Sequence, residues 1–465
     1  MNPDKRKYID LLVIAGIGLA YFLALKIHQY FAFGVHGELA DFESILWNTL
    51  HGRFFIKGAV GVSFFAEHFS PILLLLVPLY ALFSSPVTLL IIQALAAALA
   101  VIPLYLIARM KFSMKWAAVA ISLSYLFSRV VNYGLMYDFH MEIFYPLLFF
   151  WAFWAWERKL WKTLFIFLIL ALMVKEDAGV AIIGLGFYLI SLKYWRRGIA
   201  IISLSAICIT LFIFVIIPHF RSGQENTVYP FLSYWSGYGK TPQEILVHML
   251  NPLQHIRVLF TMPKMIKMFN LFSVFLFLPL LSWRRLLFLI LPGWFMLYSS
   301  DNPLLNGPLL YYGLLIIPFL FYSSVLTLDD IQKKWPKHAS KLVFGIALAM
   351  LLVNFGNSRI FKQSNPANWR IDRRFETAQQ LIKQVPKTAA VSSQVDLQSH
   401  FPVRADRYLI PDGIDQARYL LFDTQGNSWL LSKRENAALL DSLKRSSEWE
   451  VLAEKDGFVL MRRSR

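Results

Sequence analysis

Two carboxylates and an imidazole stand at alternate positions between two long apolar runs. They are Asp138, His140 and Glu142, in the stretch MYDFHMEIFYP. An ionisable group at membrane depth is costly, so it usually faces a watery cavity or a charged partner. In a helix Asp138 and Glu142 share a face, whereas in an extended segment His140 lies beside both. Either arrangement can bind a polar substrate or a divalent cation. A short polar loop at the level of the lipid headgroups is the structural alternative.

Three more polar stretches interrupt the apolar sequence. They are HGELADFESILWNTLHGRFF (residues 36–55), FFAEHFSP (64–71) and MVKEDAGV (173–180). A carboxylate in such a stretch can remove a proton from an acceptor, and a lysine can hold a phosphate. A salt-bridged turn at the membrane interface is the structural alternative for MVKEDAGV.

The composition indicates which class of protein positions these groups. Hydrophobic residues make up 57% of the chain, against about 45–50% in soluble domains. We therefore expect an integral membrane protein. The net charge of +17 would suggest nucleic acid as a partner of a soluble chain, but here the lysines and arginines separate apolar runs, as in cytoplasmic loops. The single cysteine, Cys208, excludes an intrachain disulfide and a cysteine-based metal site.

The apolar runs predict about eleven transmembrane helices. These begin near Tyr8, Val87, Trp116, Met141, Thr163, Gly179, Ile199, Phe269, Leu286, Gly307 and Leu342. The intervening stretch from Ser70 to Phe83 is short and contains Pro78, and we expect a helix there that lies along the outer face. An ordinary short span is the alternative.

The distribution of basic residues favours this topology. With Ser70 to Phe83 outside the membrane, 18 lysines and arginines in six clusters fall on one side and 8 on the other, as the positive-inside rule requires. The cluster of Lys5, Arg6 and Lys7 then makes the N-terminus cytoplasmic. The four polar stretches fall at the outer ends of spans, so we expect them to line one shared site on the outer face.

The sequence changes character after the last predicted span. Helix-like stretches (RRFETAQQLIKQV, RENAALLDSLKRS) alternate with strand-like ones (AAVSS, RYLIP, ARYLLFDT, WEVLAEKDGFVLMRR). We therefore expect an all-α polytopic membrane domain over residues 1–355 and a small extracytoplasmic α/β domain over residues 356–465.

Six motifs, in their order along the chain, resemble a known family. They are DFESILWNTLHGRFF, EHFSPILLLLVPLYALF, LYLIAR, YDFHMEIFYPLL, VKEDAGV and a late VPKTAAVSS…DGFVLMRR. The chain resembles domain-of-unknown-function family 2079 of predicted prokaryotic membrane proteins. That family in turn is similar to the GT-C membrane glycosyltransferases, which take sugars from polyprenyl-phosphate carriers on the outer face.

The resemblance implies roles for the polar residues. GT-C enzymes carry an acidic residue just after the first span, and Asp41 corresponds to it as the candidate catalytic base. An N-cap of the helix FESILWNTL is the structural alternative for Asp41. The candidate substrate-binding residues are Glu67, His68, Arg129, Asp138, His140, Glu142, Lys175, Glu176 and Asp177. Where relatives often have a His-Tyr pair entering the tenth span, this chain has Tyr311 and Tyr312.

These observations lead to one main hypothesis and two alternatives. The main hypothesis is an inverting glycosyltransferase of the prokaryotic cytoplasmic membrane, with a polyprenyl-phosphate-linked sugar and membrane lipid as its partners and a cell-envelope acceptor. No metal ligands are assigned, and a divalent cation at the Asp138 motif stays open as a cofactor. A transporter or flippase with charges along its path, and a non-catalytic scaffold, are the alternatives. The tyrosines and tryptophans of the loop at residues 218–250 are interpreted as interfacial anchors, with sugar or lipid contact as the alternative.

Overall fold

The computed structural model describes residues 9–58, 61–222, 229–249, 251–307, 310–363, 365–403, 406–426 and 430–464. The predicted basic cluster of Lys5, Arg6 and Lys7, and residues 223–228 of the long loop, lie outside these ranges. The chain forms two compact units. The first comprises Met1–Phe22, Phe65–Ile72 and Gln93–Asn365, and the second comprises Leu23–Phe64, Leu73–Ile92 and Pro366–Arg465. The C-terminal residues therefore share a unit with two N-terminal stretches.

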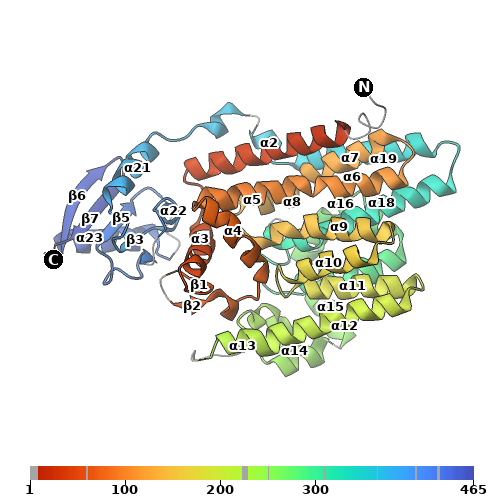
Figure 1. Cartoon of the computed structure of the whole chain (residues 1–465), viewed down its shortest axis with the longest axis horizontal. Helices are drawn as coiled ribbons and strands as arrows, with labels where there is room; N and C mark the ends of the chain where they lie inside the picture. The colour runs from red at the N-terminus through yellow and green to blue at the C-terminus, as the bar shows by residue number, and fades with distance from the viewer. Residues whose placement is uncertain are drawn as a thin grey trace. The chain divides into compact units, whose positions relative to one another are not determined.

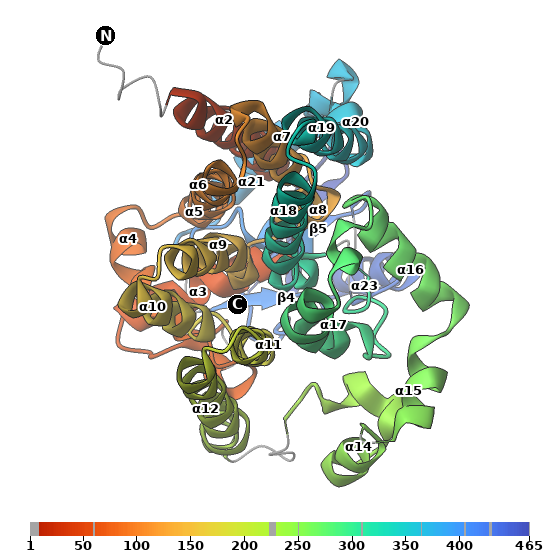
Figure 2. The same cartoon turned by 90° about the vertical axis from the view of Figure 1, so that its right-hand side faces the viewer.

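The first unit is helical, and Figure 2 shows α9, α11 and α18 nearly end-on. Two helices are divided between the units: α2 (Ile9–Phe31) and α5 (Pro86–Leu99). The α-helices that lie within the first unit are α6 (Val101–Lys111), α7 (Lys115–Leu126), α8 (Arg129–Met136), α9 (Phe144–Glu157), α10 (Trp161–Leu172), α11 (Ala178–Ser191), α12 (Trp195–Leu211), α13 (Ile217–Phe220), α14 (Pro242–Met249), α15 (Pro252–Leu259), α16 (Met262–Ser273), α17 (Leu291–Tyr298), α18 (Ile317–Lys334), α19 (Ala339–Asn357) and α20 (Ile360–Gln363).

Short 3₁₀ and π segments join or extend these helices. The 3₁₀ segments of the first unit are η3 (Met141–Ile143), η5 (Leu232–Tyr238), η6 (Leu278–Leu281) and η8 (Tyr311–Leu315), together with η1 (Phe64–Ala66) and η2 (Pro71–Leu75) at its boundaries with the second unit. The π segments are η4 (Phe212–Ile216), which links α12 to α13, and η7 (Arg285–Ile290), which leads into α17.

Helices begin close to every predicted start except one. Phe269 was the predicted start of a span, but it lies in the last part of α16, which ends at Ser273. The chain then turns through Leu276 and Phe277, which have the positive φ angles of a left-handed backbone. This break prevents one continuous helix, and the span expected to begin near Phe269 stays a prediction.

Several helices are suited to a membrane by their length and composition. Among the described residues, five are long and apolar enough to cross one: Ile9–Phe31, Pro86–Lys111, Lys115–Met136, Trp195–Phe220 and Ala339–Asn357. The total of about eleven spans stays a prediction. The helical stretch Pro71–Leu82 is about 18 Å long at 1.5 Å per residue, well short of a hydrocarbon layer of about 30 Å. Its length favours the prediction that Ser70 to Phe83 does not cross the membrane.

Close packing of α11 against α12 depends on two glycines. A Cβ atom on Gly186 would lie 2.9 Å from the carbonyl oxygen of Gly198, and one on Gly198 would lie 2.6 Å from that of Gly186. Neither contact is possible for a larger residue. Small residues allow two helix backbones to approach closely in a membrane, and here they bring the second half of α11 against the start of α12.

The second unit contains a mixed five-stranded sheet with helices on both faces (Figure 1). Its strands are β3 (Val391–Ser393), β4 (Arg407–Leu409), β5 (Tyr419–Asp423), β6 (Trp449–Lys455) and β7 (Phe458–Arg463), in the order β4-β3-β5-β7-β6. Its helical segments in this part of the chain are η9 (Pro366–Trp369), α21 (Arg374–Gln384), α22 (Val395–Gln398) and α23 (Lys433–Arg445). Strand β3 pairs in parallel with β4 and β5, and β7 pairs antiparallel with β5 and β6.

Alternate residues of the central strands fill the two cores of this sheet. Leu421 of β5 faces the core that contains Leu381 of α21, whereas Leu420 faces the core that contains Leu440 of α23. This alternation is the strand period of two. The predicted α/β character of the C-terminal region is therefore confirmed. Phe33, which follows α2, belongs to the same core as Leu381.

The remaining elements of the second unit come from the N-terminal part of the chain. They are α3 (Gly37–Leu50), the two-stranded hairpin of β1 (Ile56–Lys57) and β2 (Val62–Ser63), and α4 (Val77–Leu82). Helix α3 packs against α4, β1 and α22.

Candidate functional site

The turn between α10 and α11 carries three consecutive charged residues. Lys175, Glu176 and Asp177 follow the end of α10 at Leu172 and precede the start of α11 at Ala178. The amide of Ala178 donates to the Lys175 carbonyl at 3.2 Å, which closes the turn. Lys175 and Glu176 are 6% and 3% exposed, and Asp177 is half-buried. The charges of this turn therefore face the interior of the unit.

Lys175 is paired with a carboxylate of the MYDFHMEIFYP stretch. Its Nζ lies 2.9 Å from Oε1 of Glu142, and Nδ1 of His140 lies 3.5 Å from Oε2 of the same carboxylate. The backbone at His140 is extended, and Glu142 lies in η3. Of the two conformations considered for this stretch, the structure has the extended one around His140. The ring of His140 stacks on Tyr311 with 3.6 Å between centroids.

Glu176 connects two segments of the first unit to the same turn. Its Oε1 lies 2.7 Å from Nδ1 of His68 and accepts a hydrogen bond from the Tyr229 hydroxyl at 2.7 Å. Its Oε2 accepts from the backbone amide of Phe69 at 3.3 Å. Burial alone would raise the pKa of Glu176, but His68, Lys175 and the Tyr229 hydroxyl stabilise the carboxylate and hold its pKa below the ordinary value.

Asp177 has the opposite electrostatic environment. Burial raises its pKa to about 7, with Glu142 adding to the effect and Lys175 opposing it. The hydroxyl of Tyr145 donates a close hydrogen bond to Oδ1 of Asp177. Two adjacent carboxylates therefore differ in charge near neutral pH: Glu176 is ionised, and Asp177 is close to its titration midpoint.

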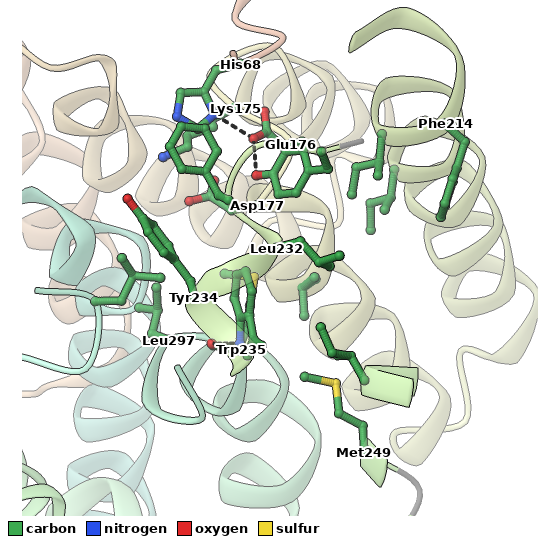
Figure 3. A pocket seen from close by; sticks show the side chains of 18 of the residues that line it. His68, Lys175, Glu176, Asp177, Phe214, Leu232, Tyr234, Trp235, Met249 and Leu297 are labelled. Atoms are coloured by element: carbon green, nitrogen blue, oxygen red, sulfur yellow. Dashed lines mark hydrogen bonds and ion pairs between the residues drawn. The ribbon is translucent and has the colours of Figure 1, made fainter. Parts of the chain in front are cut away.

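A cavity of about 630 Å³ opens beside these residues (Figure 3). His68, Lys175, Glu176 and Asp177 lie together at one end of it, whereas Met249 lies towards the other (Figure 3). Apolar side chains form most of the wall: Val180, Ile209, Ile213, Phe214, Leu232, Trp235, Ile245, Met249, Met296, Leu297 and Leu305. The site combines a large apolar volume with one charged end.

The charges at this end are nearly balanced. Lys175 is neutralised by Glu142, and Glu176 is neutralised when His68 carries a proton. The proton on Asp177 then decides whether this end of the cavity is neutral or negative.

Three predicted site residues, Asp138, Arg129 and Glu67, lie outside the wall of the cavity. Asp138 is fully buried, and its carbonyl accepts from the Gln93 side chain at 2.9 Å. Arg129 is the first residue of α8 and lies over the Tyr133 ring at 5.4 Å. Glu67 is half-buried and directly precedes His68. None of these three residues lines the described cavity.

Asp41 lies on α3 in the second unit. Its Oδ2 is 3.6 Å from Nζ of Lys57, and its side chain is 40% exposed. The interpretation of Asp41 as an N-cap is wrong, because α3 begins at Gly37 and is preceded by His36. Asp41 therefore lies inside the helix and has no capping role. Its predicted cleft with Asp138 and Glu176 stays a prediction, because those residues belong to the first unit.

Several aromatic residues line the site. Tyr229, Tyr234 and Trp235 of the long loop line the cavity. An interfacial position was the favoured interpretation of this loop, and it stays a prediction beside the alternative of sugar or lipid contact. Tyr312 also lines the cavity, with Nζ of Lys175 at 5.2 Å from its ring. The sequence did contain a signal for Tyr312: Tyr311 and Tyr312 stand where relatives often have a His-Tyr pair.

A metal site is not formed by the described residues. Within them, no three His, Cys, Asp or Glu side chains are arranged to hold a metal ion. Glu142 has Lys175 Nζ at 2.9 Å from its Oε1 and His140 Nδ1 at 3.5 Å from its Oε2.

The long apolar helices indicate a polytopic membrane protein, and its fold is GT-C-like. Two crystal structures of ArnT from Cupriavidus metallidurans are similar in fold. The one bound to undecaprenyl phosphate has a TM-score of 0.54 at 10% identity over 97% of both chains, and the one in the apo state has 0.57 at 12% over 98% of both. At these identities the likeness shows the fold alone, and it confirms the fold expected from the sequence.

The family is shown by a second comparison. The chain belongs to the family described as "Predicted membrane protein (DUF2079)", whose model matches residues 38–460. The resemblance expected from the six motifs is therefore confirmed. A comparison with curated proteins gives no match.

Proposed function

We propose that the protein is a membrane glycosyltransferase that moves a sugar from a polyprenyl-phosphate carrier to a cell-envelope acceptor on the outer face of the cytoplasmic membrane. The observation that carries this proposal is the apolar cavity with its charged end. A polyprenyl-phosphate-linked sugar is likewise made of a long apolar part, the hydrocarbon chain, and one polar end, the phosphosugar. The fold is shared with ArnT, which was crystallised with undecaprenyl phosphate.

The transfer requires little acid catalysis, because the carrier phosphate is already a good leaving group. A base takes the proton from an acceptor hydroxyl, the acceptor oxygen forms a bond to the anomeric carbon, and the bond from that carbon to the phosphate oxygen breaks. Attack from the face opposite the phosphate inverts the anomeric configuration. The polyprenyl phosphate leaves with the bonding electron pair.

We assign Asp41 as the base that takes this proton. A half-exposed carboxylate can approach a polar acceptor, and that of Asp41 is 40% exposed, with Nζ of Lys57 at 3.6 Å. At the donor, the Lys175 ammonium and the Tyr229 hydroxyl supply hydrogen-bond donors for the phosphate at the charged end of the cavity, where His68 also lies. Glu67, Arg129, Asp138, His140, Glu142, Glu176 and Asp177 complete the proposed substrate-binding set.

A genetic and chemical comparison tests the function. Envelope glycans and lipid-linked sugars are measured in the source strain with and without the gene. We expect loss of one glycan modification and accumulation of one lipid-linked sugar. Unchanged glycans and unchanged lipid-linked sugars would refute the proposal.

Complementation with point variants tests the base. Asp41→Asn removes proton acceptance with little change of shape, and we expect transfer to fall by roughly 100-fold or more. Asp415→Asn is the matched control, because Asp415 is exposed in the same unit. Near-normal transfer by an Asp41→Asn protein present at normal levels would exclude Asp41 as the base.

A further inference from the structure

The guanidinium of Arg407 connects the sheet of the second unit to α3. Arg407 is the first residue of β4 and is 7% exposed. It donates to the Ala40 carbonyl at 2.7 Å and to Oε2 of Glu43 at 3.1 Å. It also donates to the carbonyls of Gln398 and Phe401 at 3.1 and 3.4 Å. One side chain therefore ties α3 to the end of α22 and to the edge of the sheet.

Glu43 holds α3 from a second direction. While Oε2 accepts from Arg407, Oε1 accepts from the Tyr80 hydroxyl of α4 at 3.3 Å. Glu43 and Tyr80 are 1% and 0% exposed. Helix α3 is thus fixed between α4 and the sheet by one buried carboxylate.

The start of α3 lies directly against α22. A Cβ on Gly37 would be 3.1 Å from Cγ2 of Val395, so the α3 backbone packs closely against the Val395 side chain. Nδ1 of His36 lies 3.3 Å from Oδ1 of Asp396, and the Ser399 hydroxyl donates to the His36 carbonyl at 3.4 Å. The C-terminal part of the second unit (residues 366–465, here called the small domain) therefore contacts α3 along its first two turns.

These contacts flank Asp41 without using its carboxylate. Ala40 is its immediate neighbour, and Glu43 lies two residues further on, about 200° around the helix. Arg407 thus holds α3 from the side opposite to Asp41, whose side chain stays 40% exposed. A shift of α3 at Ala40 moves Asp41 by the same amount.

We propose that Arg407 is a positioning residue for the transfer reaction: it locks α3 to the small domain and thereby fixes the Asp41 carboxylate relative to the acceptor. This inference rests on the proposed function, and specifically on Asp41 as the base. It assigns a role to the small domain, which supplies the support of the helix that carries the base. An arginine suits this role because its planar fork serves several acceptors at once, whereas a lysine ammonium does not.

The test uses the full chain with Arg407→Gln and Arg407→Lys. The donor is the lipid extract, rich in lipid-linked sugar, from the strain without the gene. Misplacement of a catalytic group by about 1 Å costs roughly 100-fold in rate, so we expect kcat to fall about 10- to 100-fold. The KM for the extract should change less than about 3-fold, because the donor cavity is lined by residues of the first unit. Arg462→Gln is the matched control, since Arg462 pairs with exposed Glu450 at the far edge of the sheet.

Amide hydrogen exchange of α3 provides a readout that needs no substrate. We expect peptides covering Gly37–Leu50 to exchange at least about 10-fold faster in Arg407→Gln, and at the normal rate in Arg462→Gln. Unchanged exchange of α3, or a normal kcat in Arg407→Gln, would overturn the inference.

A second variant keeps the test decisive if Arg407→Gln does not fold. Gly37→Val pushes α3 away from Val395 and leaves the buried charges in place. It should lower kcat and keep KM, and an unchanged kcat would overturn the inference. The proposed function fails separately: normal transfer by Asp41→Asn removes the base assignment. Loss of transfer in Asp41→Asn with normal transfer in both Arg407→Gln and Gly37→Val removes the positioning role alone.

Discussion

Lys175 and Glu142 form an ion pair of 2.9 Å in which the side chains are 7% and 1% exposed. Removing one partner of such a pair leaves an uncompensated buried charge, which typically costs about 3–5 kcal/mol. We therefore expect Lys175→Ala to lower the free energy of unfolding by about that amount. Thermal unfolding of the purified protein, followed by tryptophan fluorescence, measures the change.

The double variant Lys175→Met/Glu142→Gln is the control for this loss. It leaves no unpaired charge, so much of the stability should return. Donor binding is then compared between the double variant and the wild-type protein, since the phosphate has lost its lysine while the fold is kept. Equal stability of Lys175→Ala and the wild-type protein would contradict the buried pair.

The raised pKa of Asp177 predicts that the free energy of unfolding depends on pH. Its pKa is raised from 3.8 to about 7, so between these values the folded protein holds a proton that the unfolded chain has lost. The free energy of unfolding should therefore fall as pH rises from 4 to 7, by up to about 1.4 kcal/mol per pH unit, and level off above 7. Asp177→Asn removes this contribution and still accepts from Tyr145. The difference in unfolding temperature between the two proteins is measured at pH 5 and pH 8, and a difference independent of pH would contradict the raised pKa.

The cavity predicts the effect of a bulky substitution on lipid binding. Ile213 lines the cavity on η4, and Ile213→Trp fills part of its volume. We expect undecaprenyl phosphate to bind at least about 10-fold more weakly, a loss of about 1.4 kcal/mol. Leu352→Trp is the control, because Leu352 is 60% exposed on α19. Equal binding by both variants would place the lipid elsewhere.

The surroundings of Asp41 predict that its replacement changes stability little. Its ion pair with Lys57 is 3.6 Å long between side chains that are 32% and 40% exposed. Pairs of this kind contribute about 0–1 kcal/mol. Asp41→Asn should therefore melt within a few degrees of the wild-type protein, so that a loss of transfer reports chemistry. Glu43→Gln on the same helix should destabilise much more, because it leaves buried Arg407 without its carboxylate.

The charge bias predicts the orientation of the chain. A periplasmic reporter fused after Arg465 should be active only outside the cytoplasm, and a reporter inserted at Lys111 should be active only inside. Cytoplasmic activity of the C-terminal fusion would contradict the topology and, with it, the outer-face site.

The sequence predicted those parts of the fold that depend on local patterns. Hydrophobic runs predicted the helices, and residue alternation predicted the strands, because the helix period of 3.6 residues and the strand period of 2 can be seen in the sequence itself. The turn after Phe269 was not predicted, because the composition there is uniformly apolar whether the backbone is helical or turned. A left-handed turn at Leu276 and Phe277 leaves no mark in hydropathy.

The candidate site was predicted in its charged residues and not in their partners. An ionisable residue in an apolar run is unusual enough to indicate a functional site, so Glu142, Lys175 and Glu176 were predicted from the sequence. Tyr229 lies 53 positions from Glu176, and Arg407 lies 364 positions from Glu43. Tyrosines are ordinary at membrane interfaces and arginines are ordinary on soluble domains, so these pairings appear only once tertiary packing brings the segments together.

Phe214 lines the cavity and is also 69% exposed. It lies in Trp195–Phe220, a candidate span of which only 17% of the most apolar window is buried by the rest of the chain. We therefore expect the wall at Phe214 to border the hydrocarbon of the bilayer, which would give the proposed lipid carrier a sideways route to the charged end. For the proposed enzyme the relevant substrate concentration is the mole fraction of carrier in the membrane. Its rate should then obey surface dilution: adding inert phospholipid slows turnover, whereas adding buffer does not.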